Sequence, residues 1–225
     1  MKTETFKRHV EFSVATRILH WLRALCIFFL IATGFYLGYP FIIPVQNAEP
    51  TGFLYALIRS WHQIIGFALI GVTLFRVYIF FFSKGAKQER LTFDDVLKPS
   101  VWIAIIKAYL LIGHHPHQKG AYNPIQLVTY IMIMLLIFVM CITGLTLYAN
   151  VYHEGLGGFI GGIFKPVEVM LGGLSSVRLI HHYATWVFVI FVPLHIYLAT
   201  WNAVRYPGGG LDTMAGGYRY DKDSH

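Results

Sequence analysis

Four stretches of the chain are almost continuously apolar, and each is about as long as a membrane-spanning helix. They run roughly over 17–39, 61–83, 123–149 and 178–201. An α-helix rises about 1.5 Å per residue, so about 20 apolar residues cross the hydrocarbon core of a bilayer. We therefore predict an all-α membrane protein, a four-transmembrane-helix bundle that forms a single domain over residues 1–225.

Two further segments are apolar but do not match a full span. Residues 101–113 read VWIAIIKAYLLIG, which is too short to cross a bilayer and favours a helix at the interface. Residues 155–176 are rich in glycine and interrupted by Lys165, Pro166 and Glu168. We expect this segment to lie on the external surface, against the bilayer or a partner, with a re-entrant fifth span as the alternative. Short interfacial helices are thus expected in the second and third loops.

The high apolar and low charged content of the chain supports a membrane protein and gives its positive net charge a specific meaning. The chain is 56% hydrophobic and 13% charged, with a net charge of +7. In so apolar a chain, this charge indicates basic cytoplasmic loops rather than nucleic-acid binding. Cys26 and Cys141 lie inside apolar stretches without CxxC spacing, which disfavours a disulfide framework or iron–sulfur ligation. The polar segment before the first stretch does not resemble a cleavable signal peptide.

The distribution of lysine and arginine predicts the orientation. Fourteen of them flank the apolar stretches on one side: Lys2, Lys7, Arg8, Arg17, Arg23, Lys84, Lys87, Arg90, Lys98, Lys107, Lys119, Arg205, Arg219 and Lys222. The other two loops carry Arg59, Lys165 and Arg178. Because basic loops stay in the cytoplasm, both termini and the middle loop are expected there.

Four histidines stand in or at the edge of the apolar stretches: His20, His62, His181 and His195. Fourteen residues separate the last two, which on a helix is about 21 Å of rise with little net rotation. Both therefore share one face, from which His182 is rotated away. The predicted orientation pairs His62 with His181 near the external side and His20 with His195 near the cytoplasmic side. Two imidazoles at each level suit the axial positions of two b-type haems. A proton relay is the alternative.

The same fourteen-residue spacing singles out Gly34 and Arg76. Gly34 follows His20 by fourteen residues and is expected to face the external haem, where a missing side chain lets a porphyrin approach the backbone. Ordinary helix packing is the alternative. Arg76 follows His62 by fourteen residues and is expected to bind a propionate of the cytoplasmic haem. The alternative is an arginine that reaches the cytoplasmic interface.

Together these residues resemble a known family, the b-type cytochrome subunits of quinone-reactive, membrane-bound nickel–iron hydrogenases. Its superfamily includes the cytochrome b subunits of formate dehydrogenases. The resemblance covers nearly the whole chain, and its marks are RILHW, WHQIIGF, GAYNPIQ, RLIHHYATW and the later His195. It implies that His20, His62, His181 and His195 ligate two haem b groups. It also implies a quinone, with menaquinone favoured over ubiquinone, reduced near the cytoplasmic haem.

Within GAYNPIQ, the resemblance assigns Asn123 and Gln126 to the quinone site. Capping of the third helix by Asn123 is the alternative, which by itself leaves Gln126 unexplained. His117 is the preferred proton supplier, whereas His114 and His115 are expected to be solvated loop residues. The remaining candidates are His153 and His182, either at the surface that receives electrons or in interfacial packing.

The sequence therefore predicts a membrane anchor that carries electrons from an iron–sulfur subunit through two haems to a quinone. The resemblance implies hydrogenase small (iron–sulfur) and large (nickel–iron) subunits as partners on the periplasmic side of a bacterial inner membrane, with the hydrogen-splitting site in those subunits. Lipid and quinone are further expected partners, and nucleic acid is not. The alternatives are a formate dehydrogenase subunit, a stand-alone di-haem cytochrome, and a haem-free transporter or anchor whose histidines relay protons.

Overall fold

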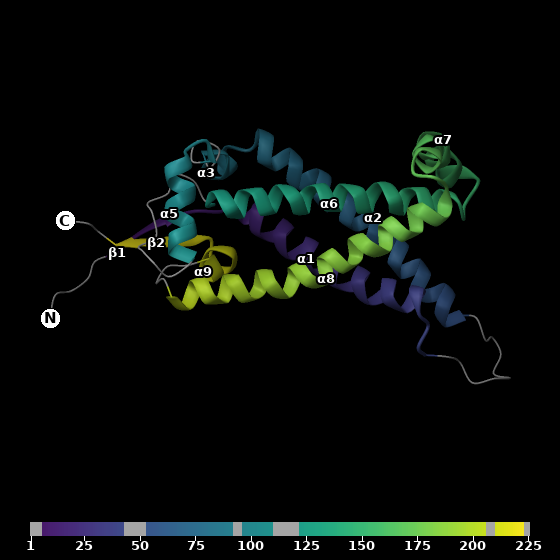
Figure 1. Cartoon of the computed structure of the whole chain (residues 1–225), viewed down its shortest axis with the longest axis horizontal. Coiled ribbons are helices and arrows are strands. Elements are labelled where there is room, and N and C mark those ends of the chain that lie inside the picture. Colours follow the sequence, from purple (N-terminus) through teal and green to yellow (C-terminus); the bar gives the residue numbers. More distant parts are fainter. Residues whose placement is uncertain (1–5, 43–52, 92–95, 110–121, 206–209, 223–225) are drawn as a thin grey trace. The chain divides into compact units, whose positions relative to one another are not determined.

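The computed structural model describes residues 6–42, 53–91, 96–109, 122–205 and 210–222. Four long helices are present, α1 (Val14–Gly38), α2 (Phe53–Phe82), α6 (Pro124–Ala149) and α8 (Leu174–Arg205) (Figure 1). Each is long and apolar enough to cross a membrane. The prediction of an all-α membrane fold with four spanning helices is thereby confirmed, although α2 starts eight residues earlier than predicted.

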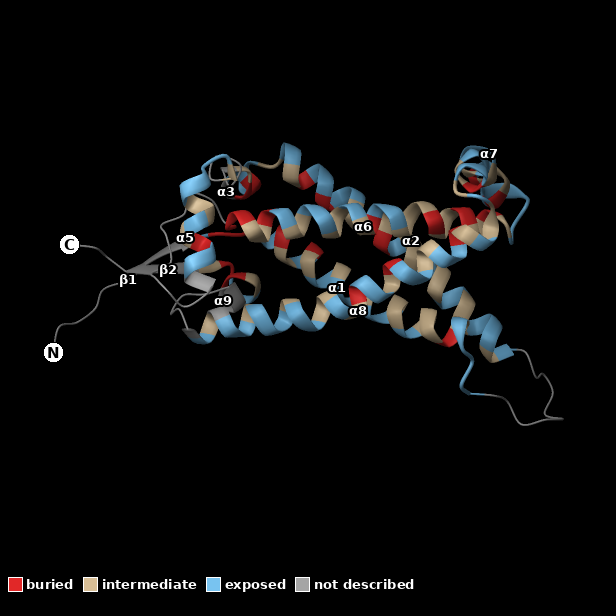
Figure 2. Ribbon diagram, in the orientation of Figure 1, coloured by how far each residue is buried: buried red, intermediate tan, exposed pale blue. Residues whose placement is uncertain are grey.

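Large apolar side chains are exposed on all four long helices. Examples are Phe28 on α1, Leu74 on α2, Phe138 on α6 and Ile190 on α8, which are 63–68% exposed. Figure 2 shows the same pattern, with exposed and half-buried positions over most of the length of these helices. An outer surface of this kind would be unfavourable in water and is suited to lipid chains.

Shorter helical elements lie between the long helices or after the last of them. They are the 3-10 helix η1 (Lys84–Ala86) and the helices α3 (Lys87–Leu91), α5 (Pro99–Tyr109), α7 (Gly155–Met170) and α9 (Gly210–Ala215). Helices do occur in the second and third loops, as α5 and α7, and their expected position at the interface stays a prediction. With 16 residues, α7 is shorter than the roughly 20 needed to span a bilayer.

One element was not predicted, a ribbon of two antiparallel strands made by the two ends of the described chain. In it β1 (Phe6–Val10) pairs with β2 (Tyr218–Lys222), from Phe6 opposite Lys222 to Val10 opposite Tyr218. Gly217 precedes β2 with a φ of 85°, and its carbonyl accepts the N–H of Glu11 at 2.9 Å. A Cβ at Gly217 would lie 3.1 Å from a backbone oxygen, so glycine suits this turn in both conformation and space.

The chain divides into two compact units. One comprises residues 1–20, 74–134 and 193–225, and the other comprises 21–73 and 135–192. We call them the terminal unit and the central unit. Each long helix contributes residues to both, and each unit contains one of the two predicted histidine pairs.

Both units have their own packing. In the terminal unit, a buried core cluster consists of Phe12, Tyr122 and Leu127, with Tyr130 and Met214 packed against it. In the central unit, aromatic pairs join neighbouring helices, with ring centres 5.1 Å apart for both Phe35–Trp186 and Phe67–Tyr148.

The helix α7 is held to the end of α6 in the central unit. Glu168 of α7 is buried and accepts hydrogen bonds from Asn150 Nδ2 at 2.8 Å and Lys165 Nζ at 2.9 Å. These bonds hold the pKa of the Glu168 carboxyl below its ordinary value, because they stabilise the charged form. The segment 155–176 is thus anchored at one polar side chain.

Candidate functional site

In the central unit, the imidazoles of His62 on α2 and His181 on α8 face one another. Their ring centres are 6.4 Å apart and the ring planes are inclined by 66°. Both residues are only partly exposed. The structure therefore brings together the two histidines that the sequence pairs.

A threonine hydroxyl holds the Nδ1 atom of each of these imidazoles. Thr33 Oγ1 lies 2.8 Å from Nδ1 of His62, and Thr143 Oγ1 lies 2.8 Å from Nδ1 of His181. Each hydroxyl donates its one hydrogen to a backbone carbonyl four residues earlier, at 2.7 Å and 2.8 Å respectively. The hydroxyl must then accept from the imidazole, so Nδ1 carries the proton. The Nε2 atom of each ring is left with its lone pair, as a metal ligand requires.

A glycine follows each of these threonines and lies against the same imidazole. A Cβ at Gly34 would lie 3.4 Å from Cε1 of His62, and one at Gly144 would lie 3.5 Å from Cε1 of His181. The pair Thr33–Gly34 on α1 and the pair Thr143–Gly144 on α6 thus support one ring each. Gly34 lets the imidazole of His62 approach the α1 backbone, and the expected approach of a porphyrin there stays a prediction.

In the terminal unit, His20 on α1 and His195 on α8 form the second pair. Their ring centres are 6.2 Å apart and the planes are inclined by 53°. The ring of Tyr130 lies 6.3 Å from that of His195 and 4.9 Å from that of Tyr122. These aromatic contacts connect the second pair to a buried polar cluster in the same unit.

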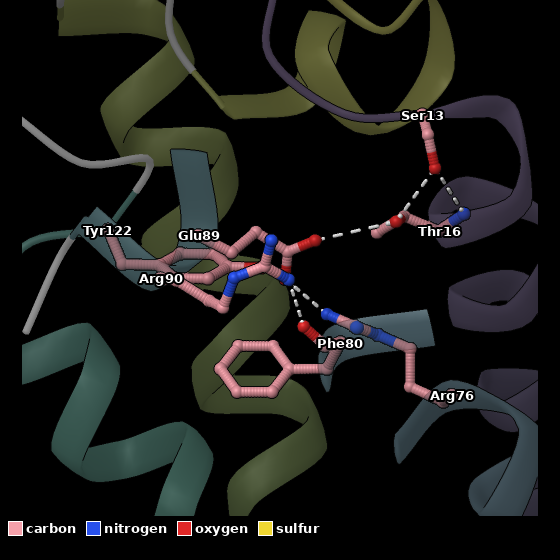
Figure 3. Close-up of polar contacts among 7 residues, drawn as sticks. All are labelled: Ser13, Thr16, Arg76, Phe80, Glu89, Arg90 and Tyr122. Carbon is pink, nitrogen blue, oxygen red and sulfur yellow. Dashed lines mark hydrogen bonds and ion pairs between the residues drawn. The ribbon is translucent and has the colours of Figure 1, made fainter. Parts of the chain in front are cut away.

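That cluster is centred on Glu89 of α3, which is 1% exposed. Its carboxylate forms an ion pair with Arg76 of α2 and accepts a hydrogen bond from the Tyr122 hydroxyl at 3.1 Å. The hydroxyl of Thr16 on α1 donates to Glu89 Oε1 at 3.4 Å and lies 3.0 Å from Oγ of Ser13. Figure 3 shows these side chains converging on the carboxylate. We refer to Arg76, Glu89, Tyr122 and Thr16 as the Glu89 cluster.

The surroundings of Tyr122 keep its hydroxyl protonated. Burial raises the pKa of Tyr122 well above 10.0, and the neighbouring Glu89 carboxylate adds to the effect because it disfavours a second negative charge. The hydroxyl therefore remains a hydrogen-bond donor to Glu89 throughout the physiological pH range.

Arg76 belongs to the Glu89 cluster. Its side chain is 10% exposed and pairs with Glu89. Both the expected contact with a haem propionate and the alternative, in which it reaches the cytoplasmic interface, stay predictions. Its Nη1 atom is buried and has no hydrogen-bond partner among the described residues. A guanidinium with one buried nitrogen of this kind can bind a further anion.

Asn123 and Gln126 bind each other's backbone at the start of α6. The N–H of Gln126 donates to Asn123 Oδ1 at 2.8 Å, and the N–H of Asn123 donates to Gln126 Oε1 at 3.0 Å. This reciprocal arrangement is a capping box with Pro124 at the first helical position. The inference that capping leaves Gln126 unexplained is therefore wrong, since capping accounts for both residues.

The remaining histidine candidates are five residues, of which the structure describes two. His114, His115 and His117 lie outside the described residues. His153 is exposed in the segment after α6, and His182 is exposed with its ring 3.0 Å from a Cβ built on Gly38.

Comparison with known proteins places this arrangement in a family. The sequence profile described as prokaryotic cytochrome b561 matches residues 11–217, a stretch that includes both histidine pairs. The chain belongs to the prokaryotic cytochrome b561 family. Its cofactor class is therefore haem b.

Similar proteins of this cytochrome family carry more specific names. The probable Ni/Fe-hydrogenase B-type cytochrome subunit of Azotobacter vinelandii is 31% identical over 214 residues, covering 92% of this chain and 86% of the relative. The probable Ni/Fe-hydrogenase 1 B-type cytochrome subunit of Escherichia coli strain K12 is 28% identical over 232 residues, covering 98% of this chain and 94% of the relative.

Both histidine pairs fit the cofactor of a b-type cytochrome. An iron atom bonded to one nitrogen of each imidazole at about 2 Å holds the two ring centres about 6 Å apart. The observed separations of 6.2 Å and 6.4 Å match that requirement. Over the described part of the chain, no group of three or more histidine, cysteine, aspartate or glutamate side chains could hold a metal ion. Two-histidine sites suit a metal whose other ligands come from a porphyrin.

The sequence reasoning missed several residues that contact the two histidine pairs or the Glu89 cluster. Thr33, Thr143 and Gly144 could have been noticed, because the dipeptide Thr-Gly occurs in both the first and the third apolar stretch. Glu89 stands in a charged segment and shows no such signal. Tyr122 lies inside GAYNPIQ, in which the resemblance assigns only the amides Asn123 and Gln126 to a site.

Proposed function

We propose that this cytochrome is the membrane subunit of a nickel–iron hydrogenase and carries electrons through two haem b groups to a quinone. The names of its relatives support the hydrogenase complex, because they describe B-type cytochrome subunits of Ni/Fe hydrogenases. Similarity over more than nine-tenths of the chain supports carrying this role over to it.

The observation that carries the proposal is the presence of two imidazole pairs with similar ring-centre separations, one in each unit. His62 and His181 would hold one haem through Nε2, with Thr33 and Thr143 orienting the rings. His20 and His195 would hold the other. Haem b, when bound, supplies a one-electron carrier whose potential depends on its axial ligands and surroundings.

We infer the direction of electron flow from the orientation that the charge distribution predicts, together with a hydrogenase partner in the periplasm. Basic residues concentrate at both termini and in the loop between α2 and α6, which favours the cytoplasmic side for these segments. In that orientation His62 and His181 are external and receive electrons from an iron–sulfur subunit in the periplasm. Electrons would then reach the His20–His195 pair, which shares α8 with His181.

Arg76 would bind a propionate of the haem at His20 and His195. Its Nη1 atom is buried in the same unit and has no hydrogen-bond partner among the described residues, while Nη2 is engaged by Glu89. A carboxylate would satisfy Nη1 and offset its desolvation. Gly34 would leave space for the packing of His62 at the other haem.

A quinone site beside the start of α6 is supported by its position and chemistry. Asn123 and Gln126 belong to the same unit as the His20–His195 pair. Their oxygen atoms are used in the capping box, so a quinone carbonyl would be met by an amide N–H donor such as Gln126 Nε2. Quinone reduction consumes two protons, for which His117 remains the candidate supplier.

The test is purification of the full chain from its native membrane with its bound partners. We expect a reduced b-type α-band, two haems per chain by pyridine haemochrome, and co-purifying nickel–iron and iron–sulfur subunits. Recovery of formate dehydrogenase subunits, or of no partner, would reject the hydrogenase assignment. Absence of the α-band would leave the haem-free proton relay as the remaining function.

A further inference from the structure

We propose that Glu89 is the counter-ion of the haem pocket formed by His20 and His195, and that it holds the potential of that haem below the value that Arg76 alone would impose. This inference rests on the proposed function in one respect, since it requires haem b at that pair. Glu89 does not touch the histidines and is therefore a positioning and charge-compensating residue.

The first support is the burial of the two charges. The side chain of Glu89 is 1% exposed and that of Arg76 is 10% exposed, and their ion pair lies within the terminal unit. Solvent screens buried charges weakly, so they act over longer distances than charges at the surface. An unpaired Arg76 would place a full positive charge in this environment.

The second support is the connection between the Glu89 cluster and the histidine pair. Thr16, which donates to Glu89, lies four residues before His20 on α1, one helical turn away. On the other side, Tyr122 donates to Glu89 and packs on Tyr130, whose ring contacts that of His195. His20 thus lies one turn along α1 from a residue that binds the carboxylate, and His195 is connected to it through the rings of Tyr130 and Tyr122.

The third support is the completeness of the carboxylate's hydrogen bonding. Glu89 Oε2 receives Arg76 and Tyr122, and Oε1 receives Thr16. Donors from α1, α2 and the segment before α6 therefore stabilise the ionised form of the carboxyl group. The negative charge that compensates Arg76 is built into the fold.

The electrostatic consequence has a definite sign. Reduction adds one electron to the haem iron, and a nearby positive charge favours the reduced state. Removing Glu89 should raise the potential, and removing Arg76 should lower it. Removing both should return it close to the starting value, because the two charges largely cancel in the native protein.

The experiment is a spectroscopic redox titration of the purified holo-complex for Glu89→Gln, Arg76→Gln and the double variant. The relevant haem is the spectral component lost in His20→Ala. For the gain or loss of one buried unit charge in the same unit as the haem, we expect the ratio of reduced to oxidised haem at a fixed potential to change roughly threefold to tenfold. Glu168→Gln is the matched control, since it removes a buried carboxylate from the other unit and should leave this ratio unchanged.

Shifts of the same sign in both single variants, or no shift in either, would overturn the inference. If Glu89→Gln fails to assemble, Arg76→Lys and Arg76→Gln carry the test, since the lysine retains the charge and should keep the native potential. Equal shifts in these two would also overturn it. If His20→Ala has the same haem content as the native complex, the proposed function is contradicted instead. The two failures are therefore distinguishable.

Discussion

Replacing Thr33 by valine should weaken haem binding at the His62–His181 pair without disturbing the packing of α1. Valine has nearly the shape of threonine but lacks the hydroxyl that lies 2.8 Å from Nδ1 of His62. The Nδ1–H group would then lose its acceptor in a partly buried site. Thr143→Val should act in the same way on His181, whose Nδ1 lies at the same distance from Oγ1.

The size of the effect follows from the cost of a buried donor without a partner, about 1–3 kcal/mol. That corresponds to roughly fivefold to 150-fold in binding, which agrees with the roughly tenfold to 100-fold loss typical of residues that orient a metal-ligating histidine. The two threonines hold different ligands of one haem, so the double variant should lose more affinity than either single variant.

The assay is the rate at which haem leaves the purified protein for an apo-haem acceptor protein, together with haem content. Thr146→Val is the matched control, because Thr146 is on α6, is 1% exposed and donates only to its own helix at 2.8 Å. Thr33→Ser restores the hydroxyl and should restore retention. Haem loss in Thr33→Val and Thr143→Val no faster than in Thr146→Val would refute the hydrogen-bond argument.

Four further outcomes are expected. His181→Ala should lose one haem by pyridine haemochrome, whereas His182→Ala should keep both. Gly34→Val should lower haem content, because the larger side chain displaces the imidazole packed on α1. Gln126→Ala should lower the free energy of unfolding by about 0.5–2 kcal/mol through loss of the capping box. The same variant should reduce quinone more slowly while keeping electron transfer from hydrogen to an artificial dye. The anchor of α7 should weaken in acid, because the pKa of Glu168 is lowered in the folded protein. The stability that the Glu168 carboxylate contributes is present at and above about pH 4.5 and is lost as the pH falls through the pKa of the folded state.

Three of these outcomes have a matched comparison. Gly71→Val tests general helix tolerance, because nothing lies within 4 Å of a Cβ at Gly71. Equal haem loss in the two glycine variants would contradict the packing argument. For α7, hydrogen exchange as a function of pH reports the anchor, and Glu168→Gln should abolish its acid dependence. Haem loss in the alanine variant of His182, but not of His181, would contradict the assignment of the α8 ligand.

Local properties of the chain made the long helices and the histidine pairs predictable. The length of an apolar stretch decides whether it can cross a bilayer as a helix. Because His181 and His195 are fourteen residues apart, helical geometry puts them on one face of the same helix. The capping box was equally local, since Asn123 and Gln126 have the spacing of a reciprocal cap. Only its Asn123 half is predicted from the sequence, because the resemblance assigns Gln126 to a quinone site.

Contacts between distant segments could not be predicted in this way. Thr33 and His62 are 29 residues apart, Thr143 and His181 are 38 apart, and Thr16 and Glu89 are 73 apart. Glu89 belongs to a charged segment that usually remains in water, and only the packing of α1, α2 and Tyr122 around it makes it a buried counter-ion. The strand pairing of β1 with β2 likewise joins the two ends of the described chain.

By itself, the sequence determined which segments are helices and which helical positions carry imidazoles, because helix formation and spacing depend on neighbouring residues. The tertiary structure decided which hydroxyl holds each ring of the central pair, and with it the tautomer that exposes Nε2. It also decided that Arg76 pairs with Glu89. Hydrogen bonds and burial depend on which distant residues share a space, and only the folded chain brings those residues together.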